Sequence, residues 1–234
     1  MPAERAFHPE LSQTVHPDVL AIYTDLRILT LLRKMHHMDK DFVPTPEYEY
    51  LYLKRTYAID HRILLFPYIT PGYTESALER CIRLACLIFT ESTIFKNEPF
   101  KRSRLSFLHS HLIGTMLTMD LENYWAETPN LLFWIIGMGA YSAKDRLERP
   151  WFVRNLADGV VKLGVRGCDD AVAVARNFLF LEYLHNPGFD KIGDEVWAYL
   201  GRTKMGKGMP DAEPNRPLEI GWQEANGSMA ECSV

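Results

Sequence analysis

The feature that most constrains the fold is an uncharged run near the middle of the chain, LLFWIIGMGAY at residues 131–141. As a helix this run is apolar on every side, because Leu131 and Trp134 mark one face while Phe133 covers another. A helix that spans a bilayer needs about 20 such residues, so the run is too short for that role. It therefore predicts the buried central helix of a soluble domain, over residues 131–144.

Elsewhere the apolar residues recur at the three- and four-residue spacing of helices, and no segment shows the strict alternation of a strand. Cys81, Leu84 and Ile88, for example, fall on one face of a helix. The pattern predicts helices over residues 16–38, 45–65, 100–118, 128–144, 150–164 and 189–200, with two more beginning at residues 74 and 169. We therefore predict an all-α fold, a single helical domain of about seven or eight helices packed around the central helix at 131–144.

Local signals indicate where these helices begin and end. Thr45-Pro46 is typical of a helix start, and Thr74 is the expected cap of the third helix. Pro67 is expected to end the second helix. The run from His185 to Gly188 includes a proline and a glycine, and we expect it to stop one helix before the last one begins.

Two further predictions concern helix faces. The first helix is expected to bury an apolar stripe made of Leu20, Tyr23, Ile28, Leu31, Leu32 and Met35. On the third helix, Glu79 and Arg83 are expected to form an ion pair one turn apart on the exposed side. In the central helix, Gly137 and Gly139 would let neighbouring helices approach the backbone closely.

The 234 residues suit one domain with tails. Residues 1–15 form a polar N-terminal arm, and residues 16–201 form the all-helical domain. Residues 202–234 are rich in Gly, Pro, Asn and Glu without an apolar period, which predicts a disordered tail.

The net charge of −4 argues against a bare nucleic-acid-binding domain, which would usually be basic. None of the four cysteines forms a CxxC pair, and a chain of this size needs no disulfide framework. The N-terminus is too polar for a signal peptide. We therefore expect an intracellular, not secreted protein, nuclear or cytoplasmic, with no membrane partner and no direct DNA binding.

Several residue patterns resemble parts of chemical sites, but none has the spacing or the partners that such a site needs. Neighbouring histidines point apart on a helix, and a single Glu-x-x-His lacks the second copy that a carboxylate di-iron bundle needs. The patterns are His36-His37, His109 with His111, Glu182 with His185, Asp169-Asp170, Ser142 in GAYSAKD, and Gly137-Met138-Gly139. We predict no catalytic, cofactor-binding or metal-binding residues, no cofactor, and a protein that is not an enzyme.

Several segments, in order, resemble a known family. Residues 131–156 pair a buried Trp-bearing helix with Arg149-Pro150-Trp151-Phe152, as in the signature region of the fungal-specific transcription factor domain. Residues 49–64 resemble the helix that opens many of these domains. Residues 73–94 and 173–197 resemble the helix that follows it and the family's closing helices.

The resemblance implies a helical regulatory domain that acts in transcription, in the nucleus, through protein partners such as the transcriptional machinery or a DNA-binding partner. Members carry a six-cysteine zinc cluster near the N-terminus, whereas the first cysteine here is Cys81, so we expect either a regulator-like domain without the DNA-binding module or a fragment of a longer protein. A homodimer and a small-molecule effector stay open. The alternatives are an accessory protein of a biosynthetic pathway and an all-helical enzyme whose site residues are scattered in the sequence.

Overall fold

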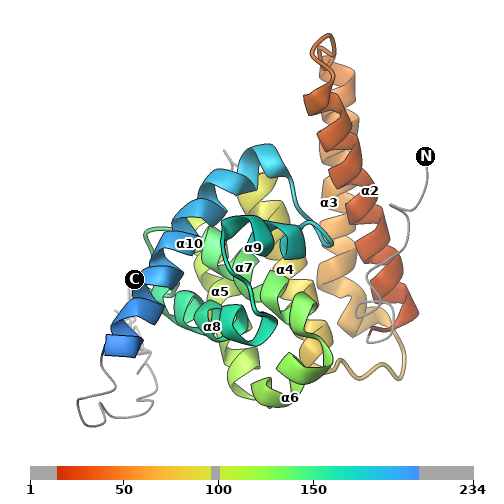
Figure 1. Cartoon of the computed structure of the whole chain (residues 1–234). Helices are drawn as coiled ribbons and strands as arrows, with labels where there is room; N and C mark the ends of the chain where they lie inside the picture. The colour runs from red at the N-terminus through yellow and green to blue at the C-terminus, as the bar shows by residue number, and fades with distance from the viewer. Residues whose placement is uncertain (1–14, 96–100, 206–234) are drawn as a thin grey trace, which may run out of the picture.

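The computed structural model describes residues 15–95 and 101–205, and within them it contains nine α-helices and no strand (Figure 1). This confirms the all-α prediction. The helices are α2 (Pro17–Met38), α3 (Pro46–Ile69), α4 (Ala77–Thr93), α5 (Lys101–Leu117), α6 (Leu121–Glu127), α7 (Pro129–Ser142), α8 (Arg149–Leu163), α9 (Cys168–Ala175) and α10 (Glu182–Met205). The short α6, which begins after the capping side chain of Asp120, was not predicted.

Helix α7 is the centre of the fold, and it contacts α4, α5, α6, α8, α9 and α10. Every residue from Leu131 to Ala140 is buried, as expected for a helix that is apolar on all sides. Trp134 is fully buried, and its indole Nε1 donates a hydrogen bond to the carbonyl of Leu179 at 3.1 Å. The central helix begins at Pro129, one residue after the start of the predicted helix 128–144, and it ends at Ser142, two residues before the predicted end.

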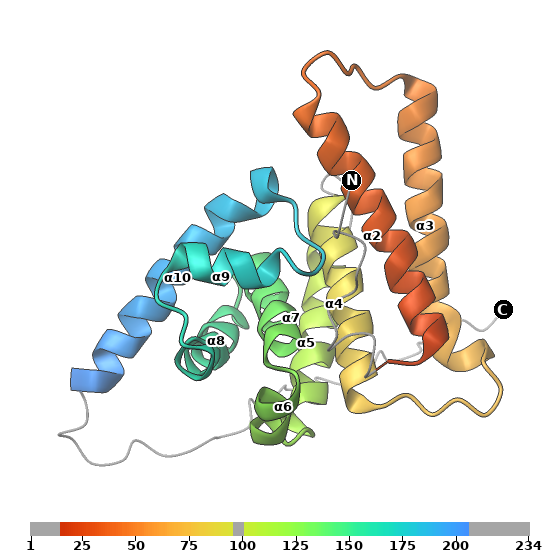
Figure 2. The ribbon, with the colours of Figure 1, turned by 45° about the vertical axis from the view of Figure 1, so that its right-hand side comes forward.

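Helices α2 and α3 form a hairpin on one side of the molecule (Figures 1 and 2). Its lower half packs on α4, while the tip around residues 39–45 extends beyond the other helices in both views. The hairpin is held by ion pairs between α2 and α3, one from Arg62 to Asp25 and one from Arg33 to Glu49 at 2.9 Å. It is therefore a projecting arm with a defined geometry.

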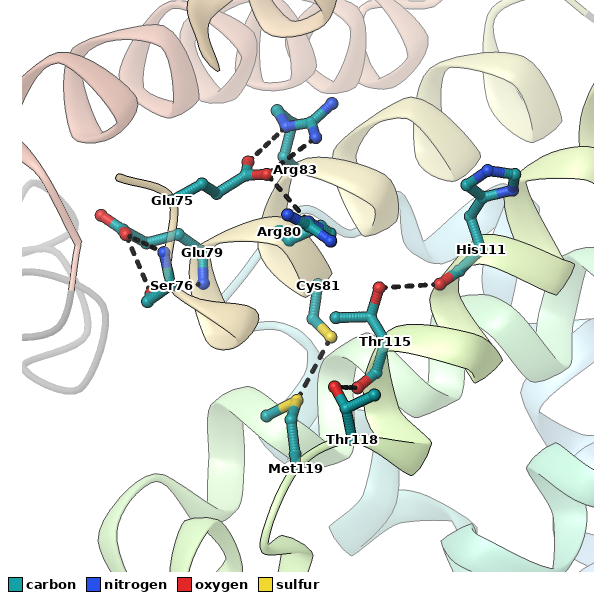
Figure 3. A network of polar contacts seen from close by, with 10 residues as sticks. All are labelled: Glu75, Ser76, Glu79, Arg80, Cys81, Arg83, His111, Thr115, Thr118 and Met119. Carbon is teal, nitrogen blue, oxygen red and sulfur yellow. Dashed lines mark hydrogen bonds and ion pairs between the residues drawn. The ribbon is translucent and has the colours of Figure 1, made fainter. Parts of the chain in front are cut away.

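The start of α4 differs from the prediction (Figure 3). Ser76, not Thr74, caps the helix, and Glu79 completes a capping box by accepting a hydrogen bond from the backbone N–H of Ser76 at 3.0 Å. Glu79 also accepts from the N–H of His16 at 2.7 Å, so its carboxylate is buried and does not reach Arg83. The predicted exposed Glu79–Arg83 pair is therefore wrong, and Arg83 pairs with Glu75 instead.

Two proline signals were also misread. Helix α3 passes through Pro67 and ends at Ile69, because a proline in the last turn removes only one backbone hydrogen bond. Helix α10 begins at Glu182 and passes through Pro187, so the predicted stop at residues 185–188 is wrong. At this point Gly188 leaves room for the ring of Tyr141, because a β-carbon there would lie 2.5 Å from Cε2 of that ring.

The predicted arm at residues 1–15 and the predicted tail at residues 202–234 lie almost wholly outside the described residues. In the described part of the tail, α10 continues to Met205, three residues past the position where the tail was expected to begin. None of the helices in residues 15–95 and 101–205 combines the length and the apolar character that crossing a membrane requires.

Candidate functional site

Exposed apolar side chains are concentrated on the α2–α3 hairpin. Of the seventeen large apolar side chains that are exposed among the described residues, twelve lie between Ile28 and Ile69. The rest of the described chain is more than three times as long as this segment and carries only five. Monomeric soluble proteins rarely expose large contiguous apolar patches unless these bind something. The hairpin is therefore the first candidate for a functional surface.

Helix α2 is apolar on two opposite faces. The face buried against α3 and α4 carries Val19, Ile22, Tyr23, Leu26 and Leu29. The opposite face, which we call the α2 stripe, consists of Ile28, Leu31, Met35 and Met38, and all four are exposed. The predicted buried stripe, which included Ile28, Leu31 and Met35, was therefore wrong for these three residues. Hydrophobicity alone did not distinguish the face that packs from the face that remains open.

Helix α3 carries a second stripe at helical spacing. The α3 stripe consists of Tyr50, Leu53, Tyr57, Leu64 and Tyr68, each of them exposed. These residues follow one another at intervals of three, four or seven, so they share one face of the helix. Tyrosine is enriched in protein–protein interfaces, where its ring contributes contact area and its hydroxyl stays hydrated.

A basic edge accompanies the α3 stripe. Lys54 and His61 are exposed and lie beside the stripe, within one helical turn of Tyr57, whereas Arg55 points about 100° further around the helix, away from the stripe. Arg62 is engaged with Asp25 on α2, whereas no ion pair between described residues involves Lys54 or Arg55. An apolar stripe beside uncompensated positive charge is complementary to an amphipathic segment that carries carboxylates.

His109 on α5 and Ser142 on α7 are joined by a hydrogen bond of 2.6 Å between Nε2 and Oγ. The Ser142 hydroxyl also donates to the carbonyl of Met138 at 3.0 Å, so the arrangement that satisfies both groups has Nε2–H donating to Oγ. Burial lowers the pKa of His109 to about 4, which keeps the ring neutral. In this arrangement the pair is a hydrogen bond that joins α5 to α7.

The two residues of the Glu-x-x-His pattern, Glu182 and His185, each contact a different part of the structure. His185 is buried, and its Nδ1 accepts the N–H of Leu181 at 2.9 Å, which leaves Nε2–H to donate to Thr93 at 3.2 Å. Glu182 turns to the surface, where it pairs with Lys34 at 3.0 Å. The two side chains therefore act separately.

The remaining sequence candidates are not brought together either. His36 stacks on Phe42 and His37 stacks on Tyr183, so the neighbouring rings face different partners. Within the described residues, no group of three or more His, Cys, Asp and Glu side chains is placed to hold a metal ion.

One buried titratable group was not found from the sequence. Asp60 on α3 is buried, its Oδ1 has no hydrogen-bond partner, and burial raises the pKa of this carboxyl to about 7. A hydrogen bond from Thr90 of α4 opposes that shift. An aspartate between apolar helical residues is not distinguishable in the sequence from an exposed one.

A second surface feature is a cleft between α5, the loop 143–148 and α10, with a volume of about 1170 Å³. Its lining includes Ser142 and several basic side chains.

Comparisons with protein families, with curated proteins and with solved structures find no match to this chain. The resemblance to the fungal-specific transcription factor domain therefore stays a prediction from the sequence.

Proposed function

We propose that this protein is a non-catalytic regulatory module that binds a protein partner along the α3 stripe of its projecting hairpin. The observation that carries the proposal is the concentration of exposed apolar side chains on this arm. An arm of two paired helices presents such a face without requiring the core to rearrange. Its hydrophobic side chains remain in water until a partner covers them, and burying each one on binding is favourable by roughly 1.5–3 kcal/mol.

The occupant that fits the α3 stripe is an amphipathic helix with acidic residues beside its apolar face. The apolar contacts would come from Tyr50, Leu53 and Leu64, at the spacing of anchors in helix recognition. Lys54, which borders the stripe, would face the partner's carboxylates. The finer proposal, which the sequence resemblance supports, is that this partner belongs to the transcriptional apparatus and that the protein works in the nucleus without touching DNA.

Site-directed photo-crosslinking in cells tests the surface. A photoreactive amino acid in place of Tyr50 is expected to link the protein to an acidic amphipathic segment of another protein, identified by mass spectrometry of the linked peptides. The same group at Phe107, which is similarly exposed on α5, is the matched control and should not give this link. Links only between two copies of this chain would assign the stripe to a homodimer and contradict the proposal, as would a yield no higher than at Phe107.

A tethering assay tests the transcriptional part. The full chain, fused to an unrelated DNA-binding domain, is expected to change the output of a reporter gene, and Tyr50→Asp with Leu64→Asp should abolish that change. Leu117→Asp, an equally exposed leucine on α5, is the matched control and should retain it. If the fusion has no effect on the reporter while the crosslink at Tyr50 persists, the partner lies outside transcription.

A further inference from the structure

The cleft beside the central helix has features that packing does not require. It lies between the start of α5, the loop 143–148, the start of α8 and the first half of α10. Its volume of about 1170 Å³ exceeds the roughly 300–1,000 Å³ that ligand pockets commonly have. The cleft is therefore large enough for a small organic molecule.

The lining is cationic although the protein as a whole is acidic. Five basic residues face three carboxylates in this cleft, while the full chain carries a net charge of −4. The basic residues are Arg102, Lys144, Arg146, Arg149 and Lys191, and the acidic ones are Asp145, Glu148 and Glu195. A concave wall with an excess of positive charge concentrates the field and attracts anions.

Two of the carboxylates are already engaged. Glu195 accepts from Nε and Nη2 of Arg149, at 2.8 Å each, in a two-pronged ion pair. Glu148 accepts the hydroxyl of Ser106 at 3.1 Å. These contacts compensate Arg149 and leave Lys144 and Lys191 without an ion pair among the described side chains.

Arg102 and Arg146 lie against each other on one wall. Nη1 of Arg146 donates to the backbone carbonyl of Arg102 at 2.9 Å, which holds the two residues together. Burial lowers the pKa of Arg146 and the charge of Arg102 lowers it further, while Glu148 opposes both. Neither arginine has an ion pair among the described side chains, and an anion bound close to both positive charges would stabilise them.

The loop that carries these groups is fixed in an unusual conformation. Asp145 has a φ of 60°, a left-handed conformation that costs a residue with a side chain roughly 1 kcal/mol or more. The surrounding contacts maintain it, since Arg149 donates to the carbonyl of Ala140 and the N–H of Arg146 bonds to Ala143 at 3.1 Å. Strained backbone that is held in place in this way is common at ligand sites.

We infer that this cleft binds a small organic anion, with a carboxylate or phosphate group between Arg102 and Arg146. The apolar part of the ligand lies against Leu147 and Leu184, which also line the cleft. The site is separate from the α3 stripe and does not depend on the proposed protein partner.

Binding of two probes to the full chain tests the inference. Phenyl phosphate and phenylacetate each carry an anion on an apolar ring, and 2-phenylethanol is the neutral control. Titration followed by calorimetry is expected to show saturable binding of at least one anion and none of the alcohol. The stronger of the two anions tells whether phosphate or carboxylate is preferred.

Variants assign the binding to the cleft. Arg146→Gln and Arg102→Gln are each expected to weaken binding of the anion about tenfold, whereas Arg154→Gln, an exposed position on α8 outside the cleft, should change it less than about twofold. Tyr50→Asp on the hairpin should leave binding unchanged, which separates this site from the proposed function. Thermal melting confirms that each variant is folded. Because Arg102 is exposed, Arg102→Gln is expected to fold and tests the site even if Arg146→Gln does not. Equal binding of the alcohol, no saturation by about 10 mM, or insensitivity to both arginine changes would overturn the inference.

Discussion

The ring of Phe152 on α8 occupies the space that a side chain on Gly139 of α7 would need. A β-carbon built on Gly139 would lie 2.3 Å from Cε1 of that ring. Because Gly139 has no side chain, the first turns of α8 approach the backbone of the central helix, as the sequence predicted. The contact joins the central helix to the Arg-Pro-Trp-Phe element that follows it.

We expect Gly139→Ala to destabilise the protein by about 1–3 kcal/mol, because the rigid ring of Phe152 must move away from the new methyl group. The matched control is Gly114→Ala on α5, where nothing lies within 4 Å of the new β-carbon. Alanine is the better helix former, so that change should stabilise by up to about 1 kcal/mol. Thermal melting of both variants checks the opposite signs, and equal shifts would show that the contact does not restrict the helix pair.

Trp134→Ala should cost about 3–5 kcal/mol, because it leaves a cavity inside the central helix's packing. It also leaves the carbonyl of Leu179 without the indole N–H that now binds it. Chemical denaturation measures the change, with Trp197→Ala on α10 as the control, because that ring is partly exposed. If the two tryptophan variants lose the same stability, α7 is not the centre of the fold.

The stability of the protein should depend on Asp60 and on pH. The pKa of this carboxyl is about 7 in the folded protein and about 3.9 in the unfolded chain, so between these values the folded state holds a proton that the unfolded chain has lost. Stability should therefore fall as pH rises through this window. We expect Asp60→Asn to raise stability by about 1–3 kcal/mol at pH 8, where it removes a buried charge, and to change little near pH 4.

Urea denaturation at a series of pH values measures that difference between Asp60→Asn and the parent protein. Asp194→Asn, at an exposed position on α10, is the control and should keep the pH dependence of the parent. A parallel pH profile for Asp60→Asn would mean that the carboxyl is hydrated and ionised in the folded protein.

Ser76→Ala should destabilise the protein by about 1 kcal/mol, because the Ser76 hydroxyl caps the N–H of Glu79 at 3.2 Å. Thr74→Ala is the control, because Thr74 stands at the position that the sequence favoured and does not cap the helix. Thermal melting distinguishes the two, and a larger loss at Thr74 would restore the original prediction.

The buried face of a helix could be predicted from the sequence where apolar residues lie on one side of that helix only. On α5, for instance, Leu105, Leu108, Leu112 and Met116 follow one another at the spacing of a single helix face, and all four are buried. On α2, two apolar faces compete, and the sequence does not tell which one meets α3 and α4. The helix end predicted at Pro187 was wrong for a similar reason. Helix α10 continues past this proline, and its first turn is stabilised by residues distant in the sequence, such as Thr93, which is hydrogen-bonded to His185.

The sequence by itself determined the all-helical class and the central helix, because both depend on local spacing and on one run of apolar residues. Residues 1–234 also hold no CxxC pair and too few cysteines for a six-cysteine zinc cluster. Only the tertiary structure decided which apolar residues stay exposed on the hairpin, which carboxyl is buried at Asp60, and which arginines meet in the cleft. Burial and electrostatics depend on neighbours brought together from distant parts of the chain, and the order of residues along one helix does not specify those neighbours.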